Sequence, residues 1–192
     1  MRTVSHPRKF LLLALLATAL FSGCKKDKDP DPVNENELIT TARLTFTEQG
    51  TTAPLVFEYK DTDGDGSAPP TKFDRITLKA GTTYNLAIAL LDESKNPVVN
   101  ITEEVAEERD EHLFVYTPTP ANLMAITLTD RDANNLPVGL EASVLTGGSA
   151  TTTGKLKVQL RHQPPVNGQR VKDGTTGPGD DDLNLSFDVT IQ

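Results

Sequence analysis

The sequence has little of what catalytic and metal-binding sites usually require. Its 192 residues include one cysteine, three histidines and no tryptophan. A single cysteine excludes an intramolecular disulfide and a zinc or iron–sulfur site built from several cysteines. The motifs G-x-S-x-G, Walker A and H-E-x-x-H do not occur, and no serine lies in a recognisable catalytic motif. We therefore expect a protein that is not an enzyme.

Basic residues are also few relative to acidic ones. The chain has 19 Lys and Arg against 27 Asp and Glu, a formal net charge of −8. Three basic residues and no acidic ones precede Cys24, so cleavage before it would leave 16 basic against 27 acidic residues, a net charge of −11. A nucleic-acid partner or a polybasic membrane-binding patch needs Lys and Arg to meet phosphate. The balance argues against both and predicts a solvated protein that attracts cations.

The long hydrophobic run lies at the N-terminus. A basic segment, residues 2–9, precedes an apolar segment, residues 10–21, which is shorter than the ~20 apolar residues that span a bilayer. The letters FSGC follow and end at Cys24. This arrangement resembles the lipobox of bacterial lipoproteins, in which the signal peptide is cleaved before a cysteine that becomes lipidated. We expect residues 1–23 to be that signal peptide and Cys24 to carry the lipid; the alternative is an ordinary signal peptide with a chance cysteine.

A charged, proline-containing segment follows the cysteine. Residues 24–37 read CKKDKDPDPVNENE and contain almost no apolar side chains, which predicts a tether rather than part of a core. Such a stretch directly after the cysteine also resembles the export signals of surface lipoproteins in the Bacteroidetes group. We therefore expect an outer-membrane protein held by a lipid anchor, facing either the cell surface or the periplasm.

From residue 38 onward, apolar and polar residues alternate in short segments, the pattern of strands with one buried face. Eight or nine segments of this kind are separated by turn-forming clusters: residues 42–47, 55–60, 75–79, 82–92, 112–117, 123–129, 139–145, 155–162 and 183–191. Alternation is typical of antiparallel sheets. Segments of this length and spacing predict an all-β fold for residues 38–192, an antiparallel β-sandwich of immunoglobulin-like or jelly-roll type.

Two segments depart from this alternation. In residues 100–111, acidic residues surround Ile101 and Val105, and Asn100 and Glu103 have the spacing of an N-cap pair. This predicts one short helix, whose acidic face is either solvated or a surface for cations or a basic partner. Residues 163–182 contain four glycines and three prolines without an apolar period. They predict a long exposed loop, and loops beyond ~12–15 residues are usually functional or disordered.

The segment DTDGDG is a candidate calcium site. Asp61, Asp63 and Asp65, followed by a glycine, match the first half of an EF-hand loop, in which alternate carboxylates face one cation. The second half does not match, because the position of the bidentate glutamate is Lys72 and the flanks are predicted strands. Asp74 is a candidate for a further ligand. The alternative is a polar turn, for which Asp and Gly are equally suited.

A second segment, DRDANN, repeats part of this spacing. Asp130, Asp132 and Asn134 offer side-chain oxygens at alternate positions after another predicted strand. The alternative is again a polar turn; if both segments lie at one end of the sandwich, they could share a calcium ion or form two sites. His112 and His162 are about fifty residues apart and lack support from cysteine. We interpret them as surface or strand-end residues rather than zinc or haem ligands.

Several blocks of the sequence, among them TFTEQG, YKDTDGDG, ITLKAGTTYNLAIALLDES and FDVTIQ, resemble a group of uncharacterised Bacteroidetes lipoproteins. The resemblance covers most of the chain after Cys24 and concerns its size, its anchor and the order of the blocks. Some members are labelled as a type 1 periplasmic binding fold, which implies alternating strands and helices. The single predicted helix and the period-two alternation argue against that fold here. The resemblance implies no particular activity.

Together these features predict a non-catalytic, membrane-anchored lipoprotein that binds an unknown protein or small-molecule ligand at the cell envelope. A role as accessory to an outer-membrane uptake receptor follows only by analogy with how this bacterial group uses surface lipoproteins. The predicted loop and the acidic helix are the expected contact surfaces. The alternative is a calcium-stabilised structural or adhesion module, in which the aspartate segments make one end of the sandwich rigid.

Overall fold

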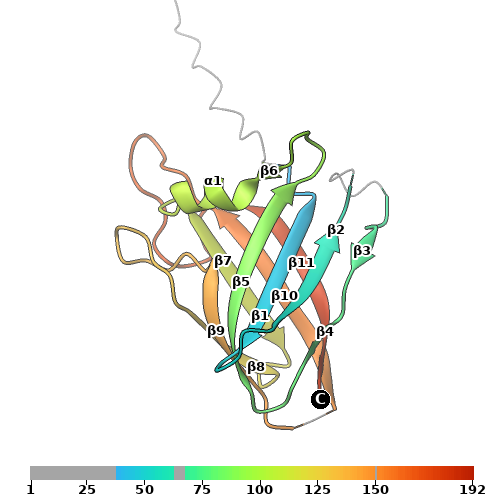
Figure 1. Ribbon diagram of the computed structural model, residues 1–192. Coiled ribbons are helices and arrows are strands. Elements are labelled where there is room, and N and C mark those ends of the chain that lie inside the picture. Colours follow the sequence, from blue (N-terminus) through green and yellow to red (C-terminus); the bar gives the residue numbers. More distant parts are fainter. Residues whose placement is uncertain (1–37, 63–67, 150) are drawn as a thin grey trace, which may run out of the picture. The chain divides into compact units, whose positions relative to one another are not determined.

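The computed structural model describes residues 38–62, 68–149 and 151–192 (Figure 1). The chain divides into two compact units, Met1–Val33 and Asn34–Gln192, and the first lies wholly outside the described residues. The predicted signal peptide, Cys24 and the tether therefore lie outside them as well. In chain order the elements are β1 (Thr41–Glu48), β2 (Pro54–Lys60), β3 (Lys72–Phe73), β4 (Ile76–Leu78), β5 (Thr83–Asp92), β6 (Val99–Asn100), α1 (Ile101–Glu107), β7 (His112–Thr119), β8 (Met124–Leu128), β9 (Glu141–Thr146), β10 (Thr152–His162) and β11 (Asp180–Ile191).

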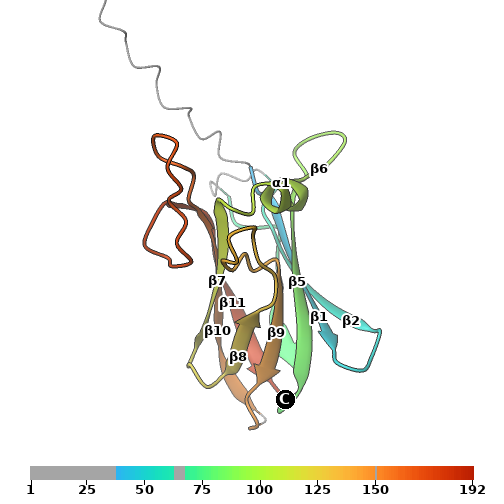
Figure 2. The same ribbon diagram turned by 90° about the vertical axis from the view of Figure 1, so that its left-hand side faces the viewer.

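These strands form two sheets that pack face to face, which confirms the predicted all-β sandwich with one short helix (Figures 1 and 2). The larger sheet has the order β3-β2-β1-β5-β9-β8, with β6 beside β5, and the smaller has the order β4-β11-β10-β7. Among the described strands, every pairing is antiparallel except that of β4 with β11. The chain leaves the larger sheet after β3, and two residues separate it from β4, which enters the smaller sheet in the same direction as β11.

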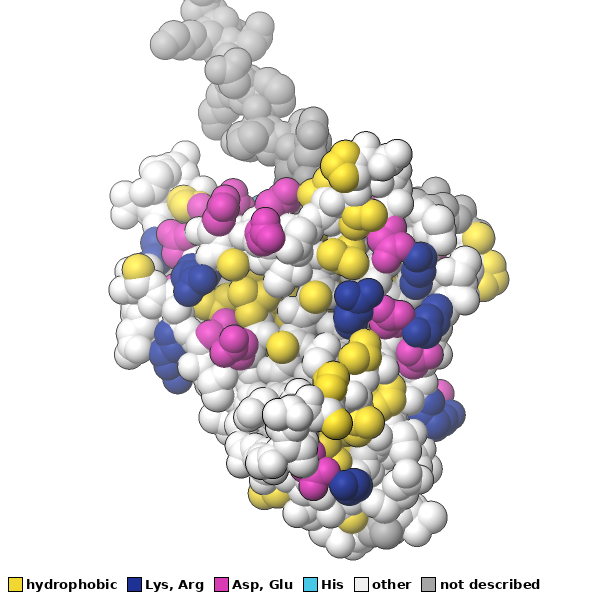
Figure 3. Space-filling model, viewed as in Figure 1, with side chains coloured by type: hydrophobic (Ala, Val, Ile, Leu, Met, Phe, Trp, Pro, Cys, Tyr) yellow, Lys and Arg dark blue, Asp and Glu magenta, His cyan; other side chains and the backbone are white. Residues whose placement is uncertain are grey.

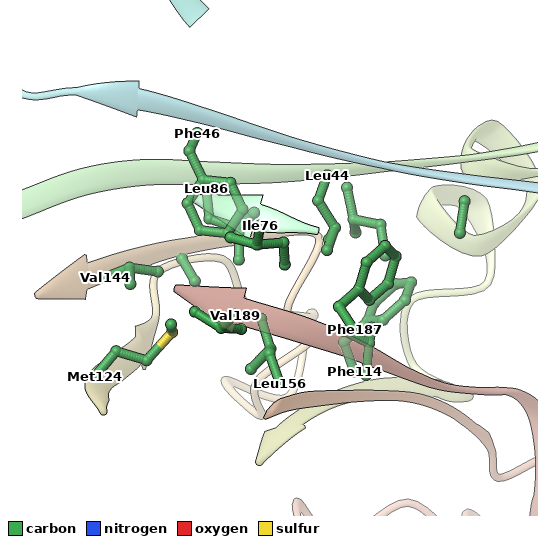
Figure 4. Close-up of a cluster of buried hydrophobic side chains, with 14 of the residues drawn as sticks. Leu44, Phe46, Ile76, Leu86, Phe114, Met124, Val144, Leu156, Phe187 and Val189 are labelled. Atoms are coloured by element: carbon green, nitrogen blue, oxygen red, sulfur yellow. The ribbon is translucent and has the colours of Figure 1, made fainter. Parts of the chain in front are cut away.

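The core is made by side chains from the two inner faces, as the alternation predicts. Leu44 and Phe46 of the larger sheet belong to one cluster of buried side chains with Phe114, Leu156 and Phe187 of the smaller sheet (Figure 4). All five side chains are fully buried. Full burial of an aliphatic or aromatic side chain contributes about 1.5–3 kcal/mol to the free energy of unfolding. The contact between the two inner faces is therefore the main source of stability.

The β1–β2 hairpin is an exception to the predicted burial. The alternation places Leu55, Phe57 and Tyr59 on the inner face, but Leu55 is 41% exposed and the other two are only partly buried. Figure 2 shows the hairpin leaning away from the smaller sheet, which agrees with the exposure of Leu55. Periodicity identifies the residues that share a face of a strand, but it does not say whether another sheet covers that face.

Helix α1 lies across one end of the sandwich, which we call the α1 end (Figure 1). It begins at Ile101 as predicted and buries Ile101 and Val105, but it ends at Glu107. Asn100 is the N-cap residue without a side-chain bond to the backbone; instead its Nδ2 donates to Oε1 of Glu103 at 2.8 Å. The predicted N-cap pair therefore forms as a contact between side chains and does not cap the helix.

Candidate functional site

The first candidate calcium segment is described only in part. Asp63 and Asp65 lie outside the described residues. Asp61 is 4% exposed, and its carboxylate accepts a hydrogen bond from the hydroxyl of Tyr59 at 3.1 Å. A buried aspartate bonded to a tyrosine already has a structural role, with or without an ion. The calcium hypothesis for this segment stays a prediction.

The carboxylate of Asp74 contacts the backbone of β2. Its Oδ2 accepts the backbone N–H of Glu58 at 3.0 Å and lies 3.1 Å from Nζ of Lys72. Glu58 lies within β2, three positions before Asp61. In an extended chain, three residues separate the two Cα atoms by ~10 Å. Asp74 thus lies beside the middle of β2, whereas Asp61 follows the end of that strand, and the choice of Asp74 as a calcium ligand stays a prediction.

The second candidate calcium segment is held by its own loop. The carboxylate of Asp130 accepts the backbone N–H groups of residues 139–141 at 2.8–3.3 Å. Oδ1 of Asp132 accepts the backbone N–H of Asn134 at 2.8 Å and that of Leu136 at 2.9 Å. Asn134 therefore contacts Asp132 through its backbone N–H and not through its side-chain oxygen. These contacts are those of a polar turn, the alternative interpretation of the segment.

A lysine lies beside Asp132 where the calcium hypothesis requires an ion. Nζ of Lys172 is 3.1 Å from Oδ2 of Asp132, and both side chains are fully buried. The same ammonium donates to the carbonyl oxygen of Arg109, just after α1, at 2.7 Å. Burial opposes ionisation of Asp132, but the N–H of Leu136 and the Lys172 ammonium outweigh it and hold its pKa below the ordinary value. A calcium ion would have to displace this lysine.

The strands that precede the two aspartate segments lie far apart in the larger sheet. The first follows β2 and the second follows β8, and β1, β5 and β9 lie between these strands in the larger sheet. At ~4.8 Å between neighbouring strands, β2 and β8 are roughly 19 Å apart. Each calcium prediction therefore has to stand on its own residues.

The long loop after β10 is mostly exposed, as predicted, but buried polar contacts hold it in place. Gln163 is 1% exposed, and its Nε2 donates to the carbonyl oxygens of Thr175 at 2.8 Å and Pro178 at 3.1 Å. Arg161 donates to the carbonyl oxygen of Pro178 as well, at 2.8 Å. Together with Lys172, these contacts attach the loop to β10 and to the end of α1. The sequence did not predict this attachment, because the residues that form it are polar and follow no apolar periodicity.

The two histidines lie side by side at the α1 end. His112 is the first residue of β7 and His162 the last of β10, and they are directly opposite each other in the ladder. Their rings are stacked, with centroids 4.7 Å apart and planes within 8° of parallel. The side chain of His112 is 2% exposed and that of His162 is 15% exposed. They are strand-end residues as predicted, but His112 is buried, His162 is only partly exposed, and the two rings contact each other.

Carboxylates surround this pair and form with it a histidine cluster of Glu108, Glu111, His112, His162 and Asp182. Oδ2 of Asp182 lies 3.7 Å from Nε2 of His112 and 3.9 Å from Nδ1 of His162. Oε2 of Glu111 lies 3.7 Å from Nε2 of His162. Nδ1 of His112 is 3.1 Å from the carbonyl oxygen of Glu108.

The charge states in the histidine cluster follow from burial. Burial lowers the pKa of His112 to about 4, so its ring is neutral near pH 7. Burial and the neighbouring acids Glu108 and Asp110 raise the pKa of Glu111. A neutral imidazole beside carboxylates can accept a proton, accept a hydrogen bond or bind a metal ion.

The separation of these residues along the chain explains why sequence reasoning did not find the histidine cluster. Its members come from three strands and from the segment after α1. The available signal was that His112 opens one predicted strand and His162 closes another, since antiparallel neighbours would bring such ends together. The pairing of β7 with β10, which crosses two intervening strands, could not be read from alternation alone.

Comparison of the chain with protein-family models, with curated proteins and with solved structures finds no match. The resemblance to Bacteroidetes lipoproteins therefore stays a prediction. The functional assignment of this chain rests on its own residues and on the contacts they make at the α1 end.

Proposed function

We propose that this protein is a non-catalytic, lipid-anchored binding module of the outer membrane and that it contacts its partner through the α1 end. The observation that carries this proposal is the buried contact of Lys172 with Asp132 and with the carbonyl oxygen of Arg109. This contact joins the long loop to the turn that follows α1, although the two lie about sixty residues apart in the sequence. Acting as accessory to an outer-membrane uptake receptor is the role we favour for such a module.

The joined surface is acidic. Glu103, Glu107, Glu108 and Asp110 are exposed on α1 and the turn after it. Figure 3 shows acidic side chains gathered along the helix. Charge of one sign on one partner favours charge of the opposite sign on the other and speeds association. We therefore favour a partner that presents a basic surface.

The loop beside the helix adds shape to this surface at little entropic cost. A flexible loop loses conformational entropy when it becomes ordered on a partner, and that loss weakens binding. Here Lys172 and Gln163 already hold residues 163–179 in place through buried hydrogen bonds. A loop ordered before binding is what a recognition surface requires.

Attachment to the membrane depends on Cys24 in this proposal. Within the described residues, no helix has both the length and the apolar character needed to cross a bilayer. Metabolic labelling with a radioactive fatty acid tests the anchor: label on the wild-type protein and its loss in Cys24→Ser would support it. Equal labelling of the two proteins would contradict it.

The partner surface can be tested by neutralising charge on α1. In the bacterium that encodes the protein, we expect Glu103→Gln with Glu107→Gln to reduce chemical cross-linking to a specific envelope protein. The control, Glu48→Gln with Glu141→Gln, removes the same charge from strands of the larger sheet and should leave the product unchanged. Equal yields from both double variants would reject α1 as the contact surface.

A further inference from the structure

Three strands end at one place and bring nitrogen and oxygen atoms together there. His112 on β7 and His162 on β10 are cross-strand neighbours, and β11 pairs with β10 on its other side and supplies Asp182. One carboxylate oxygen of Asp182 lies 3.7 Å from Nε2 of His112 and 3.9 Å from Nδ1 of His162. The same oxygen therefore faces a nitrogen of each imidazole.

The contact between His112 and Asp182 joins two hydrogen-bond acceptors. A carbonyl oxygen can only accept, so the 3.1 Å contact of the Glu108 carbonyl with Nδ1 of His112 places the ring proton on Nδ1. In the neutral ring, Nε2 then presents its lone pair, and it faces a carboxylate that is only 9% exposed. A metal ion placed between these two groups would accept an electron pair from each of them. Proteins orient metal-binding imidazoles in this way, with the second ring N–H donated to a backbone carbonyl.

We propose that His112, His162, Asp182 and Glu108 bind a divalent transition-metal ion of the Zn²⁺ class. The Glu108 carboxylate completes the ligand set, because one of its oxygens and one nitrogen of each ring lie within 4.8 Å of one another. Two imidazoles and two carboxylates form a donor set that suits Zn²⁺ and its neighbours in the transition series. Calcium takes oxygen ligands and would gain nothing from the histidines. The two carboxylates would balance the double charge of the ion.

Binding the ion requires the two stacked rings to separate. An imidazole lone pair lies in the plane of its ring, and the two ring planes are within 8° of parallel. Parallel rings cannot both direct a lone pair at one ion located ~2.0–2.1 Å from each nitrogen. His162 is the ring that rotates, since its side chain is 15% exposed. His112 is 2% exposed and is held by the carbonyl of Glu108.

The bound ion would connect β7, β10, β11 and the turn after α1 through one centre. Because the ligands meet only in the folded chain, metal binding would favour the folded state by mass action. This inference does not depend on the identity of a protein partner, so cross-linking to α1 and metal binding can succeed or fail separately.

The test uses the full-length protein in detergent, without a polyhistidine tag and stripped with EDTA. We expect calorimetric titration with Zn²⁺ to show one ion per chain and thermal melts to shift upward on its addition. In His162→Gln we expect the affinity for Zn²⁺ to fall by more than the roughly 10–100-fold that loss of an outer-shell partner costs. Absence of Zn²⁺ binding in the wild type, or equal affinity in His162→Gln, would overturn the proposal.

Matched acidic variants separate the site from general surface binding. Glu108→Gln should weaken Zn²⁺ binding, whereas Glu107→Gln, one position earlier on the chain, should not. Asp182→Asn should abolish the visible absorption of the Co²⁺-loaded protein, and Asp181→Asn should retain it, because the Asp181 carboxylate bonds to Arg161 and Asn184 instead. Glu108 is exposed, so we expect Glu108→Gln to fold. This variant therefore tests the site even if a histidine variant does not fold. Equal Zn²⁺ affinity in Glu107→Gln and Glu108→Gln would remove Glu108 from the ligand set.

Discussion

The Lys172 ammonium and the Asp132 carboxylate form an ion pair 3.1 Å apart, with both side chains inaccessible to solvent. Removing one member of a buried pair leaves the other charge without compensation. We expect Lys172→Met to lower the free energy of unfolding by about 3–5 kcal/mol, measured by denaturant titration.

Two further variants control for the Lys172 prediction. Asp132→Asn combined with Lys172→Met should recover part of the loss, because neither charge then remains. Lys155→Met removes a lysine from the exposed pair with Asp188 and should have a much smaller effect. A Lys172→Met protein as stable as Lys155→Met would contradict the importance of the buried pair.

The pKa of His112 predicts a dependence of stability on pH. The unfolded chain binds a proton at His112 near pH 6.5, but the folded chain does so only near pH 4, so the unfolded state holds more protons between these values. The free energy of unfolding should therefore fall as the pH drops from 6.5 to 4, by about 3 kcal/mol from this residue. Denaturant titrations of wild type and His112→Gln in EDTA, at several pH values in this range, isolate the contribution. Identical slopes in both proteins would show that His112 is not the group responsible.

Two glycines with the same backbone angle offer a matched test of packing beside the histidine cluster. Gly179 and Gly168 both have φ of +72°, which disfavours any side chain, but a Cβ at Gly179 would overlap the carbonyl oxygen of His162 whereas one at Gly168 meets no atom within 4 Å. We expect Gly168→Ala to cost about 1–2 kcal/mol of unfolding free energy and Gly179→Ala clearly more. Thermal or denaturant unfolding of the two variants provides the comparison, and equal losses would show that the close approach at His162 is not required.

Calcium binding can be assigned to one aspartate segment or to neither by thermal melts. The contacts of Asp130 and Asp132 with backbone N–H groups and Lys172 lead us to expect that calcium leaves the midpoint of Asp63→Ala unchanged. If the first segment binds calcium in the wild type, saturation at a hundred times the dissociation constant adds about 2.7 kcal/mol and raises the midpoint by roughly 5–10 °C. A calcium-dependent shift in Asp63→Ala that disappears in Asp132→Asn would contradict our interpretation of the second segment.

Alternation predicted the strands well because a strand with one buried face has apolar residues at every second position. It placed Leu44, Phe46 and Phe187 correctly in the core. It failed for Leu55, since whether a second sheet covers a strand depends on the bend of a hairpin rather than on its residues. The two-residue strands β3 and β6 were not predicted, because they are too short to show a period.

The polar contacts at the α1 end could not be predicted in the same way. Lys172 reads as a surface lysine in a glycine-rich loop, and only the fold shows that it meets Asp132. Likewise, His112 and His162 become neighbours only through the pairing of β7 with β10. Residue type suggests the chemistry of a side chain, whereas its partners depend on which strands pair.

The position of β11 has a consequence for the order in which the protein can be made. This strand lies between β4 and β10 in the smaller sheet, yet the ribosome delivers it after all the other described strands. Until residues 180–191 emerge, β4 has no neighbour in that sheet and the inner face of the larger sheet is incompletely covered. Long-range pairing of this kind makes folding slow. For the exported lipoprotein that we propose, a sandwich that stays open until β11 arrives would suit a chain that crosses a membrane before it folds.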